Sequence, residues 1–268
     1  EVIKSARDIL ETPDGIIVSS SGIYRFRDDG SIDEHFQAPT LWTGSIDGLF
    51  QLSTGHLLIA GSNEYHLSDN TLIRRRAVLR LLPDGAVDLT FPDFDGDVLA
   101  VDSTDRIYVS QDRLLHRFTR DGSIDTTWTV MSFDHNIMSV TPTPFGGIYI
   151  ISYGSDKNRL IRLDESGKID PGFEPLDIVR VISQRPSLKV LTDEKLIVLL
   201  ADPHDSNITR IARLLPNGEL DSTFQPPGEV GELLGFWGDH PLVAYRDLIT
   251  KPGFAGRLNA VGGLDNSW

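Results

Sequence analysis

Short apolar runs alternate with turn-forming residues along the whole chain. Triplets of apolar residues recur after turns rich in Gly, Asp or Pro, at residues 16–18, 57–59, 107–109, 148–150, 196–198 and 242–244. An unbroken apolar run of this length is typical of a strand that is buried on both faces of its sheet. A weaker strand pattern, such as residues 48–52, precedes each turn. No segment has a helical periodicity, so the pattern predicts an all-β protein.

A longer phrase of mixed polar and apolar residues follows each triplet. It reads YRFRDDGSIDEHF at residues 24–36 and LRLLPDGAVDLTF at residues 79–91, and it occurs six times. Five positions hold in every copy: Arg five residues before a glycine, Phe or Leu four before, an aliphatic residue two after, Asp three after, and Phe or Trp six after. The glycines are Gly30, Gly85, Gly122, Gly167, Gly218 and Gly262. A phrase repeated this often indicates a structural repeat.

The turn inside the phrase is predictable from its residue types. In Pro83-Asp84-Gly85, proline supplies the φ of about −65° that a type I turn needs, and glycine supplies the positive φ of the residue that follows. This combination predicts a three-residue hairpin loop in each copy.

The two arms of the predicted hairpin place the repeated residues on two faces. Arg80 lies opposite Asp88 on one face, and Leu81 lies opposite Val87 on the other. Continued alternation places Phe91 on the face of Leu81. We therefore expect a cross-strand ion pair in every copy, with the repeated aliphatic and aromatic residues in the core.

Each repeat thus holds four strands in a meander, with the buried strand second. One such sheet cannot cover its own faces, but four-stranded blades arranged radially cover each other. The sequence predicts a single β-propeller domain over residues 1–268. Its six blades span approximately 1–36, 37–91, 92–128, 129–173, 174–224 and 225–268.

The repeated arginine, turn glycine, aspartate and aromatic residue resemble the Delta-60 β-propeller repeat. That resemblance covers nearly the whole chain, and it implies a bacterial surface or secreted protein without implying an activity. The strand order is similar, more distantly, to NHL propellers and to the gluconolactonase family, whose members hold a divalent cation in the central channel.

The composition is that of a folded, acidic protein. Of its 268 residues, 40% are hydrophobic and 24% are charged, and the formal net charge is −14. This acidity argues against partners such as nucleic acid or an anionic membrane surface, because both reward clustered lysine and arginine. No apolar run of about 18 residues is present, so no membrane insertion is expected. The absence of cysteine excludes disulfides and thiol chemistry.

The loops that lead into the predicted blades differ from copy to copy, as the loops of a binding surface do. The candidate ligand- or partner-binding residues on them are Trp42, Glu64, His66, Asp95, His135, Arg180 and His204. We assign none of them to catalysis or to a metal.

Two acidic, histidine-containing loops leave a second interpretation open. FDHN at residues 133–136 and DPHD at residues 202–205 offer carboxylate and imidazole ligands for Ca²⁺ or Zn²⁺, which could activate water. Neither loop has the spacing of an EF-hand or of an HExxH helix, and such residues often bond the local backbone instead. We therefore expect no cofactor, with Ca²⁺ as the alternative.

No nucleophile elbow, phosphate-binding loop or Ser-His-Asp arrangement is found in the sequence. We expect a non-enzymatic, extracellular or surface-associated scaffold that binds a protein partner or assembles with its own kind. The chain begins at Glu1 rather than at methionine, which is consistent with a processed, secreted product. The alternatives are a divalent-metal-dependent hydrolase of the lactonase type that uses the central channel, and a carbohydrate-binding propeller that takes a glycan.

Overall fold

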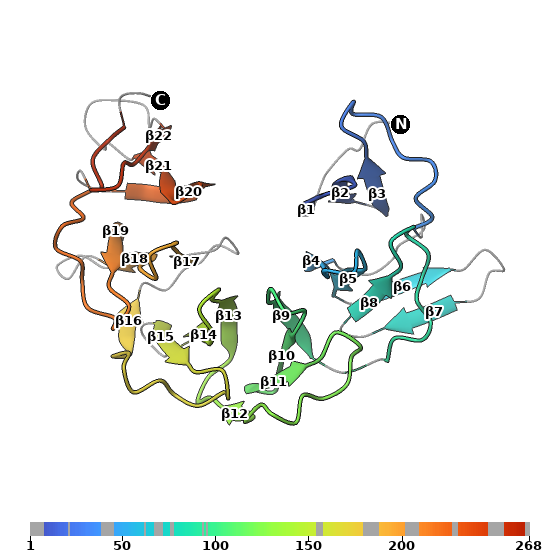
Figure 1. Ribbon diagram of the computed structural model, residues 1–268, viewed down its shortest axis with the longest axis horizontal. Helices are drawn as coiled ribbons and strands as arrows, with labels where there is room; N and C mark the ends of the chain where they lie inside the picture. Colours follow the sequence, from blue (N-terminus) through green and yellow to red (C-terminus); the bar gives the residue numbers. More distant parts are fainter. Residues whose placement is uncertain are drawn as a thin grey trace. The chain divides into compact units, whose positions relative to one another are not determined.

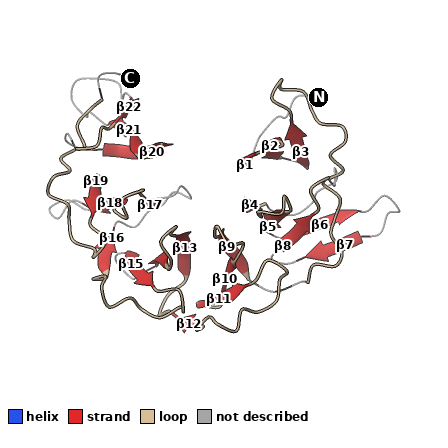
Figure 2. Cartoon of the chain, viewed as in Figure 1, coloured by secondary structure: helices blue, strands red, loops and turns tan. Residues whose placement is uncertain are grey.

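The computed structural model of the chain describes residues 8–20, 22–38, 46–61, 63–66, 72–75, 78–92, 94, 96–153, 158–178, 188–201, 209–226, 230–245 and 255–265. The chain divides into two compact units, Glu1–Asp134 and His135–Trp268. Within the described residues all regular structure is strand, as Figure 2 shows.

The first unit holds three small antiparallel sheets and one inserted hairpin (Figure 1). The first sheet has the order β1-β2-β3, formed by Asp8–Thr12, Gly15–Ser19 and Ile23–Phe26. The second sheet has the order β4-β5-β8, formed by Gly48–Gln51, Leu57–Ala60 and Val78–Leu81. Between β5 and β8 the chain forms the hairpin β6-β7, Asn63–His66 with Leu72–Arg75. The third sheet is β9-β10-β11-β12, formed by Asp97–Val101, Ile107–Gln111, Leu114–Phe118 and Met131–Ser132.

The second unit holds three further antiparallel sheets. The fourth sheet is β13-β14-β15-β16, formed by Ile137–Pro142, Ile148–Ser152, Asn158–Leu163 and Leu176–Ile178. The fifth is β17-β18-β19, formed by Leu188–Val190, Leu196–Ala201 and Thr209–Leu214. The sixth is β20-β21-β22, formed by Val230–Trp237, His240–Tyr245 and Ala255–Arg257.

Six small meander sheets of this kind are the blades of a β-propeller, and the predicted fold class is confirmed. Within the described residues, the third and fourth sheets have four strands and the others have three. In the third and fourth sheets the repeated phrase begins in the third strand, and the fourth strand, β12 or β16, comes after the phrase in the chain. The fourth strand pairs with the third, so the hairpin of the phrase does not itself supply the last strand of these two sheets. The residue limits proposed for the blades stay a prediction.

The apolar triplet of the second strand is buried in the second to fifth sheets, as its sequence predicts. Every residue of β5 and of β14 is buried. Both strands lie between two hydrogen-bonded neighbours, and the two faces of β5 pack in two different apolar clusters.

The predicted hairpin turn is present in all six copies. The turn glycine has a φ between 79° and 91° in each of them. In the second sheet the Gly85 amide donates to the Leu82 carbonyl at 2.8 Å, and the Leu82 amide donates to the Ala86 carbonyl at 2.8 Å. A residue with a side chain is strained at this φ, which is why glycine recurs here.

The predicted face of the repeated aromatic residue is wrong. Phe91 lies on the face of Arg80, whose Cζ is 4.3 Å from the centroid of the Phe91 ring. Residues 88–91 form a turn in which the Phe91 amide approaches the Asp88 carbonyl at 3.4 Å. The two-residue alternation of a strand therefore ends before it reaches Phe91.

The repeated aliphatic residue is not core in every copy, in contrast to the prediction. Its exposed fraction lies between 37% and 65% in four copies, at Ile32, Ile124, Ile169 and Leu220. Each of these residues pairs with its strand through one isolated bridge, so the return arm stands at the edge of the sheet. Only the residue opposite, such as Leu81 or Leu163, reaches the fully buried interior.

The core lies between neighbouring sheets of each unit. Ile17 of the first sheet packs in one cluster with Leu57 and Leu81 of the second. Leu58 on the other face of the second sheet packs in a cluster with Val98 and Ile107 of the third. Equivalent clusters join the fourth sheet to the fifth and the fifth to the sixth.

Each of four hairpin turns also rests on the segment that follows the hairpin of the sheet before it. We call this segment, from the repeated aspartate to the second residue after the aromatic, the repeat tail. Backbone amides of three tails donate to the carbonyl before the next turn glycine: Gln37 to Asp84 at 2.7 Å, Glu174 to Asn217 at 3.0 Å and Gln225 to Val261 at 2.8 Å. A Cβ built on Gly262 would lie 2.9 Å from the Gln225 and Pro226 nitrogens, and one on Gly122 would lie 2.6 Å from Pro92 Cγ.

This contact predicts that replacing a turn glycine lowers the free energy of unfolding for two separate reasons. Gly262→Ala should lose about 1 kcal/mol to the positive φ and about 1–3 kcal/mol more to overpacking against the fifth sheet's tail. Gly238→Ala in the same sheet should lose only the first amount, because its φ is 59° and its Cβ would meet nothing within 4 Å. Urea unfolding of both variants measures the difference, and equal losses would contradict the contact.

Candidate functional site

The most regular polar site of the chain is the cluster of arginine, aspartate and aromatic residue in each repeat. All six predicted ion pairs are present, with nitrogen to oxygen distances between 2.5 and 3.3 Å: Arg25–Asp33, Arg80–Asp88, Arg117–Asp125, Arg162–Asp170, Arg213–Asp221 and Arg257–Asp265. The backbone explains the pairing, because the aspartate amide donates to the arginine carbonyl across the hairpin, as in Asp88 to Arg80 at 2.9 Å. The predicted ion pairs are confirmed.

A hydroxyl two residues after the aspartate holds its carboxylate in place in three copies. The Thr223 amide and hydroxyl donate to Asp221 Oδ1 at 3.0 and 2.6 Å. Thr90 and Thr127 hold Asp88 and Asp125 in the same way. One carboxylate oxygen therefore faces the arginine and the other faces the local turn.

These hydrogen bonds keep the aspartates ionised. The hydrogen bond from Thr223 is the main cause that lowers the pKa of Asp221 far below its ordinary range, and Lys195 and Arg213 add to it. The Arg25 hydrogen bond lowers the pKa of Asp33. Burial acts to raise the pKa of Asp88, but the hydrogen bonds from Thr90 and Arg80 outweigh it and leave the pKa lowered. Carboxylates held in this state are poor proton donors and poor general bases near neutral pH.

The arginine also reaches the neighbouring sheet, which the sequence did not predict. Its guanidinium donates to the carbonyl two residues before the next turn glycine in three junctions: Arg25 to Pro83 at 3.1 Å, Arg80 to Arg120 at 2.8 Å and Arg213 to Ala260 at 2.5 Å. The same guanidinium lies over the aromatic residue of its own tail, with Arg213 Cζ 4.9 Å from the Phe224 centroid. We call this guanidinium, with its several donors in one plane, the arginine fork. It links its own hairpin, the repeat tail and the next sheet.

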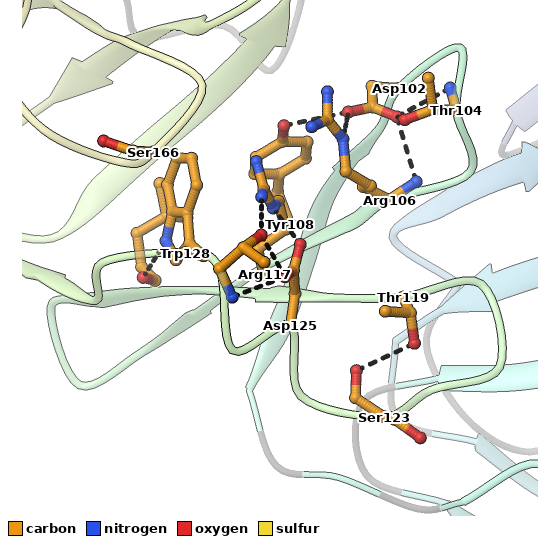
Figure 3. A network of polar contacts seen from close by, with 12 residues as sticks. Asp102, Thr104, Arg106, Tyr108, Arg117, Thr119, Ser123, Asp125, Trp128 and Ser166 are labelled. Atoms are coloured by element: carbon orange, nitrogen blue, oxygen red, sulfur yellow. Dashed lines mark hydrogen bonds and ion pairs between the residues drawn. The ribbon is translucent and has the colours of Figure 1, made fainter.

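The third sheet contains a further polar network around Asp102 and Tyr108 (Figure 3). The Tyr108 hydroxyl donates to Asp102 Oδ2 at 3.0 Å, and Arg106 Nε donates to the same oxygen at 2.6 Å. Burial, and then the nearby Asp102 carboxylate, raise the pKa of Tyr108 to about 12. Tyr108 therefore remains a protonated donor, and its arrangement is that of a structural hydrogen bond.

A second link between neighbouring sheets lies at their first turns. Asp105 accepts hydrogen bonds from the Ser53 amide at 2.7 Å and from the Ser53 hydroxyl at 2.6 Å. In the second unit Asp239 accepts from the amide and hydroxyl of Thr192 at 3.1 and 2.5 Å. These pairs were not predicted from the sequence, although the small hydroxyl residues in the turns STG and TDE are a signal for them.

The candidate binding residues lie mostly outside the described residues. Trp42, Asp95, Arg180 and His204 fall in segments that the structure does not describe. Glu64 and His66 lie on β6, the inserted hairpin of the second sheet. His135 is exposed in the segment between β12 and β13. Their role in binding stays a prediction.

Within the described part of the chain, no group of three or more His, Asp or Glu side chains is placed to hold a metal ion. No helix long and apolar enough to cross a membrane occurs among the residues described.

Two segments of the chain, residues 52–91 and 205–224, match the family described as "Domain of unknown function (DUF5122) beta-propeller". The chain is a β-propeller protein. The matched segments contain the complete repeated phrase of the second sheet and the complete phrase of the fifth.

Solved structures with the same fold include two hydrolases. Puromycin hydrolase is 14% identical with a TM-score of 0.60, over 96% of this propeller and 44% of that chain. Porphyromonas gingivalis dipeptidyl peptidase 4 is 12% identical with a TM-score of 0.60, over 98% of this propeller and 45% of that chain. A eukaryotic initiation factor is 11% identical with a TM-score of 0.52, over 97% of this propeller and 75% of that chain. Identities this low show the fold alone, and this propeller spans less than half of either hydrolase. No curated protein matches the chain.

The lowered aspartate pKa values predict loss of stability in acid. A carboxylate whose pKa is lower in the folded state contributes its full stability above the unfolded pKa of about 4 and loses it as the pH falls through the folded pKa. The free energy of unfolding should therefore fall steadily from pH 5 to pH 2, and Asp221→Asn should make that fall shallower. Urea unfolding at several pH values measures it, and a free energy that stays constant over this range would contradict the assignment.

The arginine fork predicts that lysine cannot replace it. Arg213 donates to Asp221, Thr223 and Ala260 from three different nitrogens, and a lysine amine cannot reach all three. Arg213→Lys should lower the free energy of unfolding by about 1–3 kcal/mol. Arg159→Lys, at an exposed position of β15, is the matched control and should change it by less than about 0.5 kcal/mol. Equal effects of the two substitutions would refute the role of the fork.

Proposed function

We propose that this propeller is a non-enzymatic binding scaffold that recognises a protein partner through its variable loops. The observation that carries the proposal is that the repeated charged residues form ion pairs with each other. Arginine and aspartate pair with each other in every repeat, at distances between 2.5 and 3.3 Å. Groups that are held in structural ion pairs are not available as a catalytic set, so the chemistry that differs between blades lies in the loops.

The charge of the chain supports a protein partner. A formal net charge of −14 disfavours nucleic acid and anionic lipid and favours a partner with a basic or neutral surface. The loop residues Trp42 and Arg180 are of the types that contribute most to protein interfaces.

The resemblance of the repeat to the Delta-60 type supports an extracellular or surface location in a bacterium. The sequence has no cysteine and so has no disulfide to protect it in an oxidising compartment. Its stability would instead come from the junctions between sheets, which are compatible with such a location.

The experiment compares the loop residues with an unrelated surface of the same chain. The purified chain is used to retain proteins from the medium and envelope fractions of the source organism, and the retained polypeptides are identified by mass spectrometry. Trp42→Ala with Arg180→Ala should abolish retention of one specific polypeptide. Ile124→Ala with Leu220→Ala should leave it unchanged, because both residues are more than 60% exposed on the repeat hairpins.

Two outcomes would contradict the proposal. One is loss of retention in both double variants, or in neither. The other is turnover of lactone or ester substrates by the purified chain after addition of Ca²⁺ or Zn²⁺, since that result would favour the hydrolase alternative.

A further inference from the structure

The turn of the fifth repeat contains a chemically reactive pair of residues. Asn217 precedes the turn glycine Gly218, and it is the only asparagine of the chain that is followed by glycine. The backbone nitrogen of the following residue can attack an asparagine side chain, and glycine favours this attack because it has no side chain to obstruct the approach. Asn217 is exposed, so water and hydroxide reach its side chain.

The reaction converts the side-chain amide first to a cyclic imide and then to a carboxylate. The Gly218 nitrogen loses its proton to a base from solvent and forms a bond to Cγ of Asn217. The bond from Cγ to the side-chain nitrogen breaks, and that nitrogen takes up a proton and leaves as ammonia. A water molecule then opens the imide ring. Opening at Cγ gives aspartate, whereas opening at the backbone carbonyl carbon gives isoaspartate, in which the main chain runs through the side-chain methylene.

The folded turn restrains both reacting groups. The Gly218 amide donates to the Leu215 carbonyl at 2.9 Å, so the proton that must leave is held in a hydrogen bond. Asn217 Oδ1 accepts from the Glu219 amide at 3.1 Å, which fixes the side chain that would be attacked. Gly218 is also buried, although Asn217 is exposed. The reaction therefore requires local opening of the turn.

The repeat tail of the fourth sheet closes this turn from the neighbouring side. The two sheets lie in the same unit, and the Glu174 amide of the tail donates to the Asn217 carbonyl at 3.0 Å. A Cβ built on Gly218 would lie 2.9 Å from the Glu174 carbonyl oxygen and 3.2 Å from Phe173 Cε2. Phe173 is 2% exposed and packs in the apolar cluster between the fourth and fifth sheets. Opening of the turn therefore requires the tail to move.

The aspartate product fits the folded turn. Aspartate already stands before the turn glycine in three other copies: Asp29, Asp84 and Asp121. The Ala86 amide donates to Asp84 Oδ1 at 3.0 Å, as the Glu219 amide donates to Asn217 Oδ1. Conversion to aspartate therefore changes the charge of the turn and keeps its hydrogen bonds.

The isoaspartate product does not fit. It adds a methylene to the main chain, and it turns the Asn217 carbonyl that accepts from Glu174 into a free carboxylate. The longer chain displaces Gly218, which has no space on the side of the Glu174 carbonyl. The hydrogen bond and the packing between the tail and the turn are lost together.

We propose that Asn217 is a site of spontaneous modification, and that its conversion to isoaspartate releases the repeat tail of the fourth sheet from the turn of the fifth. The intact junction slows the reaction, and the isoaspartate product opens the junction. The site lies in a junction between sheets and not in the loops of the proposed function, so either proposal can fail without the other.

The rate of conversion tests the protective role of the junction. The intact chain is incubated at mildly alkaline pH, and peptide mapping by mass spectrometry follows residue 217. Conversion should be at least about tenfold faster in concentrated urea than in buffer, because unfolding frees the Gly218 amide. In buffer, Phe173→Leu should accelerate it at least about threefold, because a smaller side chain weakens the tail that covers the turn.

Phe91→Leu is the matched control. Phe91 holds the same place in the tail of the second sheet and is 3% exposed, but it packs in the other unit, away from Asn217. This variant should convert residue 217 within about twofold of the wild-type rate. Equal rates in buffer and in urea, or equal acceleration by Phe173→Leu and Phe91→Leu, would overturn the proposal.

Hydrogen exchange tests the consequence of the modification. Incubated chains that have gained a negative charge are separated by ion exchange, and the isoaspartate form is identified by fragmentation of its peptide. In this form the Glu174 amide should exchange at least about tenfold faster than in the unmodified chain, because it has lost its acceptor. Asn217→Asp carries the same added charge without the added methylene and should exchange like the wild type. An isoaspartate form that exchanges like Asn217→Asp would overturn the proposal.

Discussion

The structure depends on the junction between one sheet and the next. A four-stranded sheet of about this size cannot bury both of its faces alone, so each blade is stable only against a neighbour. The chain meets this constraint with apolar clusters between sheets and, at three of these junctions, with an arginine that donates to the next sheet. The guanidinium donates to a backbone carbonyl of the next turn and so adds a polar link to the apolar contact between the two sheets.

The same constraint explains why the repeated phrase is so uniform. All six turn glycines are required for the positive φ of the turn, and four of them also because the tail of the previous sheet occupies the space of a side chain. The aspartate is required to orient the arginine, and the threonine after it to orient the aspartate. Residues that act together in this way resist change, and the variation between repeats is confined to the loops.

The arginine–aspartate pairs also show that the repeated charged residues have a structural role. A carboxylate with a lowered pKa, two hydrogen bonds from a threonine and an arginine partner is fixed in both charge and position. The same is true of Tyr108, which burial keeps protonated. The proposed binding function follows from this use of the ionisable residues.

Residue types and their spacing were enough to predict the all-β class, the six repeats, the hairpin turn and the pairing of Arg80 with Asp88. These features are local: they depend on residue type, two-residue alternation and the φ of a glycine, which act within about a dozen residues. The folded structure alone sets which face Phe91 occupies and how far Ile124 is exposed, because a turn after Asp88 breaks the alternation and the return arm is held to its strand by one isolated bridge. It also decided the contacts from Arg80 to Arg120 and from Asp105 to Ser53, since residues some forty or fifty positions apart meet only when one sheet packs on the next.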